Sequence, residues 1–197
     1  MDDWHLLVGL GNPGKEYVHT RHNAGFMVLE LLAERWHANW RLEAKFQARL
    51  AKAERGGRRV LLCQPQTFMN LSGEAVQAVG AYYQIPASRM VIAVDDADLP
   101  LGEIRMRPKG GNGGHHGLES VEQHVGTREY ARLRIGIGRR TEGQRMLTGH
   151  VLGSFDSNEQ ELLKQVLAKA ASQLECWVTA GIEPAMNQFN GPIEGLV

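Results

Sequence analysis

The chain has 197 residues, of which 43% are hydrophobic, and it carries 22 basic and 22 acidic side chains. This is enough for one globular domain with a sizeable core, and no run approaches the roughly 20 apolar residues of a membrane-spanning helix. The first residues lack the basic region and cleavage site of a secretory signal, and the two cysteines, Cys63 and Cys176, form no C-x-x-C pair. Composition therefore predicts a soluble, cytoplasmic protein without disulfides or thiolate metal sites.

The neutral total hides an uneven distribution of charge. From Arg105 to Arg140 there are eight Lys and Arg residues and three acids, whereas the segment from His150 to the end has two Lys and six acids. A basic surface that meets phosphates would explain this pattern. An ordinary solvated charged face would explain it as well, so composition leaves both interpretations open.

The first third of the chain alternates between strand and helix patterns. The run "HLLVGL" predicts a buried strand that ends at the glycine-rich turn "GNPG". From Ala24 to Trp36 the apolar residues fall on one helical stripe, which predicts a helix. The segments "KFQARLAKAE" and "RRVLLCQP" flank the turn "RGG" and predict a hairpin.

The same alternation continues to the C-terminus. We expect a helix over 72–83, a buried strand at "MVIAVDD", a second strand at "EIRMRPK", a short helix after the glycine-rich loop, and a strand at "YARLRIGIG". Ser157 and Gln160 form a capping-box pattern for a long helix that reaches Ala180 and ends at Gly181. With no linker or repeat between these elements, residues 1–197 are predicted to form one α/β domain.

Ligands of α/β sheets gather at the carboxyl ends of the strands. Three candidate segments lie there: the turn "GNPG", the acids of "VDDADLPLG", and the residues after "LLCQP". We therefore expect these segments to line one crevice.

"GLGNPG" matches the G-x-G-x-x-G pattern of dinucleotide-binding folds. That fingerprint requires its third glycine to lie within a helix that packs against the strand. Here Pro13 precedes Gly14, and no helical stripe begins before Ala24. The sequence thus disfavours nicotinamide binding and favours a tight turn that displays Asn12.

Other polar residues have both structural and chemical interpretations. Asn23 is a plausible N-cap for the helix that begins at Ala24, and Asn70 or Ser72 could cap the next helix. His22, His115 and His116 could in principle join Asp95 in a metal site. No second ligand pair at zinc-finger spacing accompanies His19 and His22, so no metal is predicted.

The motifs are more informative together than singly. "VGLGNPGKEYVHTRHNAGF", "QPQTFMNLSGEAV", "VDDADLPLGEIRMRPKGGNGGHHGLESVEQHVGT" and "YARLRIGIG" follow one another in order, and "GHVLGSF" continues the series. The chain resembles the bacterial-type peptidyl-tRNA hydrolases over nearly its whole length. The resemblance implies a single α/β domain with a mixed, twisted sheet flanked by helices.

That resemblance also implies an activity. The expected reaction is hydrolysis of the ester that joins a peptide, or an N-blocked aminoacyl group, to the 3′-terminal ribose of tRNA, which recycles tRNA from prematurely released peptidyl-tRNA. His22 matches the family's catalytic histidine, a general base on water, and Asp95 matches the carboxylate that orients it. The expected enzyme needs no cofactor and no metal, and acts as a monomer.

The remaining matched residues are expected to hold the substrate. Asn12 would distinguish a peptide from a free aminoacyl group, since its amide can pair with a neutral peptide unit. Tyr17, Phe68 and Asn70 correspond to residues that contact the unpaired CCA end and the peptide, and His116 stands at a substrate-binding position. Arg107 and Arg134 match basic positions that bind acceptor-stem phosphates. Supporting candidates are Met69, Lys109 and His115.

The chain departs from the family pattern at a few positions. "GGNGGHHG" resembles the substrate loop, but His116 stands where the family has asparagine, Gln64 stands where lysine is common, and "VDDAD" replaces the usual His-Asp-Glu-Leu-Asp. The main alternative is an RNA-binding relative of the same fold without catalysis. The joint presence of Asn12, His22, Asn70 and Asp95 favours the enzyme.

Overall fold

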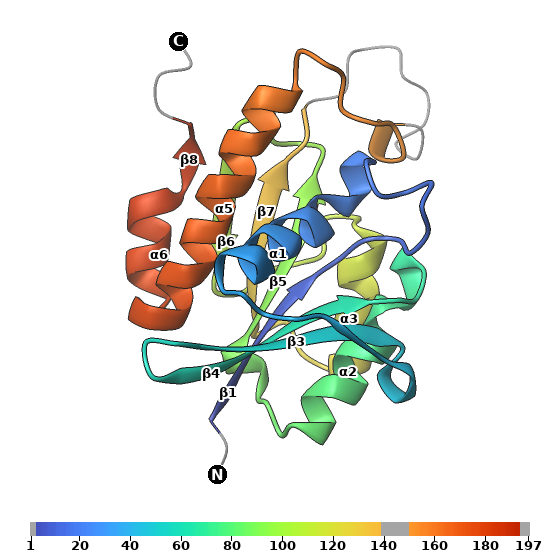
Figure 1. The fold of residues 1–197 in the computed structure, drawn as a ribbon, viewed down its shortest axis with the longest axis vertical. Helices are drawn as coiled ribbons and strands as arrows, with labels where there is room; N and C mark the ends of the chain where they lie inside the picture. The colour runs from blue at the N-terminus through green and yellow to red at the C-terminus, as the bar shows by residue number, and fades with distance from the viewer. Residues whose placement is uncertain (1–2, 139–149, 194–197) are drawn as a thin grey trace.

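One eight-stranded sheet, in the order β2-β3-β4-β1-β5-β7-β6-β8, forms the centre of the molecule (Figure 1). The structure is a computed structural model that describes residues 3–138 and 150–193. The predicted single α/β domain with a mixed sheet is confirmed over these residues. The predicted limits at residues 1 and 197 lie outside them.

Four parallel strands occupy the middle of the sheet: β4 (Arg58–Pro65), β1 (Trp4–Gly9), β5 (Met90–Asp96) and β7 (Ala131–Gly136). Their side chains are buried almost without interruption, as expected for parallel strands covered on both faces. Their carboxyl ends therefore meet at one edge of the molecule.

Antiparallel strands flank this parallel centre on both sides. On one side β3 (Ala48–Arg55) pairs with β4, and the short β2 (Arg41–Glu43) pairs with β3. On the other side β6 (Glu103–Arg107) pairs with β7, and β8 (Gly191–Pro192) pairs with β6.

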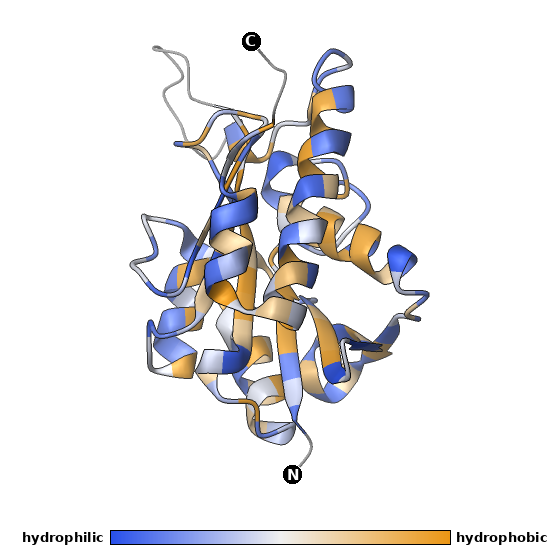
Figure 2. Ribbon diagram, turned by 90° about the vertical axis from the view of Figure 1, so that its left-hand side faces the viewer, coloured by the Kyte–Doolittle hydropathy of each residue, from blue (hydrophilic) through white to orange (hydrophobic). Residues whose placement is uncertain are grey.

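Helices cover both faces of the sheet. The first core cluster contains α1 (Ala24–Arg35) and α5 (Gln160–Ala180), with α6 (Ile182–Phe189) packed beside α5. The second cluster contains α2 (Ser72–Tyr82) and α3 (His116–Val125) on the opposite face. Figure 2 shows long hydrophobic stretches on the strands between them. Among the described residues, no helix combines the length and hydropathy required to cross a membrane.

Two glycines allow α1 to lie directly against the strand ends. A Cβ atom at Gly9 would lie 2.1 Å from the carbonyl oxygen of Gly25, and one at Gly25 would lie 2.4 Å from the oxygen of Ala93. No larger residue fits either position without moving the backbone. This close approach brings the start of α1 next to the carboxyl end of β5.

Two local predictions were wrong. The predicted strand over 45–54 begins only at Ala48, because a 3-10 turn occupies Ala44–Phe46 and Gln47 takes a left-handed conformation with φ 48°. The predicted capping box of Ser157 and Gln160 does not form, since α5 begins at Gln160 and the Asp156 carboxylate accepts the nearby backbone N–H groups instead. The predicted end of that helix at Gly181 is confirmed.

Candidate active site

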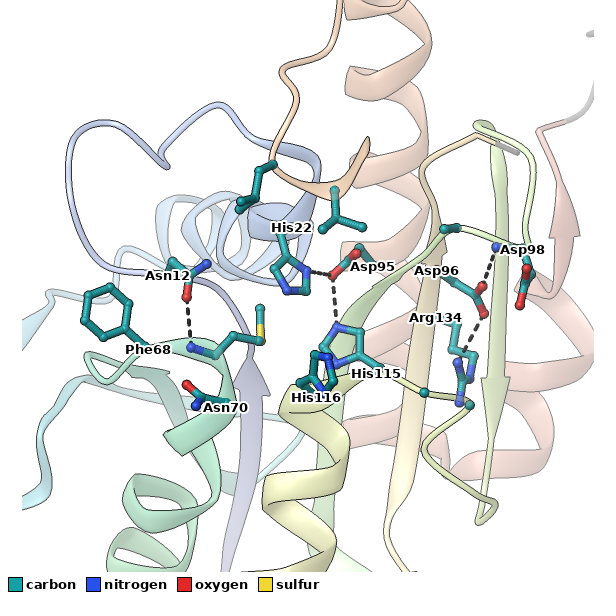
Figure 3. Close-up of a pocket in the computed structure, with 16 residues that line it drawn as sticks. Asn12, His22, Phe68, Asn70, Asp95, Asp96, Asp98, His115, His116 and Arg134 are labelled. Carbon is teal, nitrogen blue, oxygen red and sulfur yellow. Dashed lines mark hydrogen bonds and ion pairs between the residues drawn. The ribbon is translucent and has the colours of Figure 1, made fainter. Parts of the chain in front are cut away.

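A cavity of about 710 Å³ opens at the carboxyl ends of β1 and β5 (Figure 3). It lies where the sequence predicted a crevice, and all three predicted segments reach it. Nine of the predicted site residues line it: Asn12, His22, Phe68, Met69, Asn70, Asp95, His115, His116 and Arg134. Tyr17, Arg107 and Lys109 are not among its lining residues.

His22 lies in a 3-10 turn, Arg21–Asn23, immediately before α1. Its Nδ1 is 2.8 Å from Oδ1 of Asp95, the penultimate residue of β5. Asp95 is buried, with 3% of its side-chain surface exposed, and His22 is partly buried, with 13% exposed. Two residues separated by 73 positions thus meet because β1 and β5 are parallel neighbours with adjoining carboxyl ends.

Asn23 holds the turn against the loop after β1. It occupies the N-cap position of α1, as predicted, but its side chain makes no capping hydrogen bond. Its Oδ1 accepts from the backbone N–H of Asn12 at 2.8 Å, and its Nδ2 donates to the Asn12 carbonyl at 3.0 Å. The predicted cap is therefore wrong, and the side chain instead fixes Asn12 beside His22.

His115 is the second partner of Asp95. It is the N-cap of α3, and its Nδ1 accepts from the backbone N–H groups of Gly117 and Leu118 at 3.1 and 3.3 Å. An imidazole nitrogen that accepts has no proton, so the proton of neutral His115 lies on Nε2. Nε2 then donates to Oδ1 of Asp95 at 3.0 Å.

The two histidines together keep Asp95 ionised. Burial alone would raise the pKa of Asp95, but the interactions with His115 and His22 hold it well below its usual range. An ionised Asp95 accepts the Nδ1–H of His22 and leaves the Nε2 lone pair of that ring unprotonated. The arrangement therefore presents a base at His22 Nε2.

The same three residues form a cluster whose ligand atoms lie within 4.8 Å of one another, which raises the possibility of a metal site. The hydrogen bonds argue against it. With Nδ1 of His115 accepting from the backbone, Nε2 carries the proton that it donates to Asp95, and a protonated nitrogen cannot bind a metal ion. His116, a ligand in the metal alternative, is not part of the cluster.

Asn12 connects the His22–Asp95 pair to the opposite wall of the cavity. Its Oδ1 accepts from the backbone N–H of Met69 at 2.8 Å, so the amide orientation is fixed. The Nδ2 group is then directed to the side of the cavity where His22 lies (Figure 3). A donor at this position can bind a carbonyl oxygen of a ligand next to the base.

The wall beyond Asn12 is formed by the turn between β4 and α2. Met69 is buried, whereas Phe68 has 58% of its surface exposed, and Asn70 is also exposed. Neither Asn70 nor Ser72 caps a helix through its side chain, so that structural explanation of Asn70 is wrong. An exposed ring and an exposed amide remain available at the edge of the cavity.

Two arginines anchor the glycine-rich loop. Arg132, of which only 1% is exposed, donates to the carbonyl groups of Gly110 and Gly111. Arg134 donates to the carbonyls of Gly111 and Asn112 and to the Asp96 carboxylate at 3.2 Å. The loop that leads into His115 is thus held in place from β7. Sequence reasoning missed Arg132, whose only signal was that it is one of two arginines among the apolar residues of this strand.

The other predicted residues lie around the cavity rim or outside it. The side chain of His116 is 77% exposed, with Nδ1 3.4 Å from Glu119. Tyr17 is half-buried in the loop after β1, Arg107 is exposed at the end of β6, and Lys109 pairs with Glu129 at 3.6 Å. The ring next to His22 is that of His115, with centroids 5.1 Å apart.

The dinucleotide alternative does not fit the loop after β1. Gly14 has a φ of 119° in a turn, and the first helical residues come only at Arg21. The third glycine of the pattern therefore opens no helix, which the fingerprint requires.

Comparison with known proteins places this site in a family. A family model described as "Peptidyl-tRNA hydrolase" matches residues 6–195. A peptidyl-tRNA hydrolase from Synechococcus sp. (strain JA-3-3Ab) is 48% identical over 186 residues, covering 94% of this chain and 82% of that protein. One from Gloeobacter violaceus is 44% identical over 185 residues, covering 94% and 93% of the two chains. The crystal structure of peptidyl-tRNA hydrolase from Acinetobacter baumannii superposes with a TM-score of 0.89 at 40% identity, covering 96% of each chain.

Proposed function

The chain belongs to the peptidyl-tRNA hydrolase family, and we propose that His22 is the general base of its reaction and Asp95 the group that orients it. The enzyme is an ester hydrolase that acts on peptidyl-tRNA. One observation carries the proposed roles: Oδ1 of Asp95 accepts from both His22 and His115. The bond from His115 holds this oxygen in the position where it faces His22. This leaves His22 Nε2 as the unprotonated nitrogen of the pair.

The proposed reaction proceeds by attack of water on the ester carbonyl. His22 Nε2 takes a proton from the water as its oxygen bonds to the carbonyl carbon, and Asp95 stabilises the imidazolium that forms. The bond between that carbon and the ribose 3′-oxygen then breaks. His22 returns the proton to the departing oxygen, so base and charge are restored at the end of the cycle.

Asn12 is proposed to hold the peptide next to this base. Its Nδ2 would donate to a peptide carbonyl, while Oδ1 remains bonded to Met69. A free ammonium group at that position would meet a donor and be repelled. Phe68 and Asn70 at the edge would contact the CCA end by stacking and by amide hydrogen bonds, with Tyr17 and His116 as further contacts.

The acceptor stem is proposed to lie over the side of the molecule formed by β6 and the glycine-rich loop. Arg107 is exposed there, and Lys109 follows it two residues later. Arg134, which lines the cavity beside the same loop, would complete the path from the stem to the ester. We also propose that the enzyme works as a monomer in the cytoplasm, without a metal or cofactor.

The test is cleavage of N-acetyl-aminoacyl-tRNA by the wild type and by His22→Ala. Loss of a general base costs roughly two to four orders of magnitude, and the unblocked aminoacyl-tRNA should react far more slowly with the wild type. His19→Ala is the matched control, because His19 is an exposed loop histidine that lies outside the catalytic cavity. If His22→Ala turned over as fast as His19→Ala, His22 would not be the base. If the wild type bound the tRNA without cleaving it, the chain would be an RNA-binding relative.

A further inference from the structure

Arg21, the residue before His22, has a partly buried side chain that the reaction itself does not use. Only 11% of the side chain is exposed. Its guanidinium donates from Nη1 to Glu159 Oε1 at 3.0 Å and from Nη2 to Glu159 Oε2 at 2.6 Å, a bidentate pair. Nη1 also donates to the carbonyl of Ile137 at 2.8 Å, and the guanidinium carbon lies 4.7 Å from the centroid of the Phe155 ring. Such a set of contacts fixes the side chain completely.

The contact with Ile137 links the two halves of the catalytic pair. Ile137 follows β7, and its N–H donates to the carbonyl of Asp96, the residue after Asp95, at 3.2 Å. The four contacts form a closed ring. On one side, His22 bonds directly to Asp95. On the other side, Arg21 donates to Ile137, which in turn donates to Asp96, the chain neighbour of Asp95. The separation between His22 and Asp95 is therefore constrained through the backbone on both sides.

A second link reaches the cavity wall. The backbone N–H of Arg21 donates to the carbonyl of Gly153 at 2.9 Å, and Thr20 forms an isolated antiparallel bridge with Ser154. Val151 and Leu152, the residues just before Gly153, line the catalytic cavity. The backbone of residue 21 thus holds this wall against the catalytic turn, whereas its side chain holds the same turn to Ile137 and Glu159.

Glu159 is well suited to hold the guanidinium. Burial by itself would raise the pKa of Glu159, but the hydrogen bonds from Arg21 and from the backbone of Asp156 lower it, so the carboxylate stays charged. Its Oε2 accepts from the Asp156 N–H at 2.9 Å, which fixes it at the start of α5. Arg21 is therefore bonded to a rigid partner.

We propose that Arg21 is a positioning residue for the hydrolysis, whose side chain fixes His22 against Asp95 by joining the catalytic turn to β7 and to the start of α5. It touches neither the ester nor the water. The inference rests on the proposed roles of His22 and Asp95 and goes beyond them, because it assigns the accuracy of their contact to a residue outside the pair. A displacement of about 1 Å at a reacting group can cost about 100-fold in rate.

The test compares Arg21→Met and Arg21→Lys with a matched control, Arg35→Met. Arg35 ends α1 and also reaches α5, donating to Ser172 Oγ at 3.2 Å and to the Ala168 carbonyl at 3.3 Å, far along the helix from the cavity. We expect Arg21→Met to lower kcat on N-acetyl-aminoacyl-tRNA by about 10- to 100-fold with KM changed less than about threefold. Arg21→Lys, which keeps the charge but loses the fork, should recover part of that loss. Arg35→Met should leave kcat unchanged.

A second measurement reports the geometry independently of turnover. The ring N–H proton that His22 shares with the Asp95 carboxylate should give a downfield proton NMR signal, assigned by its absence in His22→Ala. In Arg21→Met this signal should broaden or move upfield, and in Arg35→Met it should not. If Arg21→Met is too unstable to study, Arg21→Lys and Glu159→Gln take its place. Each should lower kcat and change the His22 signal in the same direction, to a smaller degree.

The proposal is overturned if folded Arg21→Met keeps both the wild-type kcat and the His22 signal, or if Arg35→Met lowers kcat by an equal factor. If instead His22→Ala retained activity while Arg21→Met altered the His22 signal, the positioning would stand and the proposed base would fail. The two hypotheses therefore fail by different results.

Discussion

Replacing His115 separates its two contacts, which serve different purposes. The ring caps α3 through Nδ1 and donates to Asp95 through Nε2. His115→Ala removes both contacts, whereas His115→Asn removes only the second. Asparagine is among the best N-cap residues, but its side chain is too short to cap the helix and reach Asp95 at the same time.

The expected magnitudes follow from these contacts. Loss of an N-cap costs roughly 0.5–2 kcal/mol, and loss of a hydrogen bond to a charged group costs about 1.5–3 kcal/mol. We therefore expect His115→Ala to lose roughly 2–5 kcal/mol of unfolding free energy and His115→Asn about 1 kcal/mol less. Both variants should lose activity to the same extent, about 10- to 100-fold in kcat/KM, because both release Asp95.

Urea unfolding and steady-state cleavage of N-acetyl-aminoacyl-tRNA measure the two quantities on the same samples. The reasoning is refuted if His115→Asn restores activity together with stability, because the cap would then be the whole role of His115. It is refuted equally if His115→Ala cleaves the substrate at the wild-type rate.

The pH dependence of stability gives a further check on His115→Ala. The pKa of Asp95 is lowered in the folded state, so its contribution is complete above the unfolded value of about 3.9 and is lost as the pH falls toward the folded value. Without His115 the folded pKa should rise toward the usual range. The stability lost between neutral pH and pH 3 should then be smaller in the variant than in the wild type.

Three other outcomes are expected. Activity should survive EDTA as long as the tRNA remains folded, and a loss that zinc or manganese restores would support metal binding by the His22 cluster. Arg107→Ala should weaken tRNA binding and reduce the slope of log binding constant against log salt concentration by about 0.9 or less. Arg134→Ala should also slow the cleavage of a substrate that carries only the terminal nucleotide, because Arg134 holds the glycine-rich loop and Asp96. His116→Asn should stay active with kcat/KM equal to or above the parent, since His116 is exposed at the rim; a folded but inactive variant would give His116 an essential role of its own.

The strand ends were predictable because they depend on long, continuous patterns. Buried apolar runs mark β1, β4 and β5, and parallel strands must place their carboxyl ends at one edge. His22, Asp95 and Asn70 follow such runs or precede helices, so their convergence followed from topology together with the family resemblance. The short β2 and β8 carried no comparable pattern and were not predicted. The helix α6 was also not predicted, although Ile182, Ala185, Met186 and Phe189 have helical spacing, because the pattern spans only two turns.

The side-chain partners within the site were less predictable, since local sequence offers several equivalent hydrogen bonds. Asn23 and Asn70 precede helices as good caps do, yet neither caps one, because tertiary partners or solvent compete for the same atoms. His115 is the reverse case: histidine is not a favoured cap, but here it caps α3 and binds Asp95. Only the three-dimensional arrangement shows which contact is made.

The basic segment shows why the charge of a sequence is not the charge of a surface. Of the eight cations between 105 and 140, Arg139 and Arg140 lie outside the described residues. Arg132 is buried on loop carbonyls, and Arg134 faces the carboxylate of Asp96. The charges of Arg132 and Arg134 interact mainly with groups of the protein, because a paired or buried cation contributes little to the electrostatic potential at a distant phosphate. Stem recognition should therefore depend most on Arg107, and the salt dependence of binding should report fewer phosphate contacts than the sequence count of cations suggests.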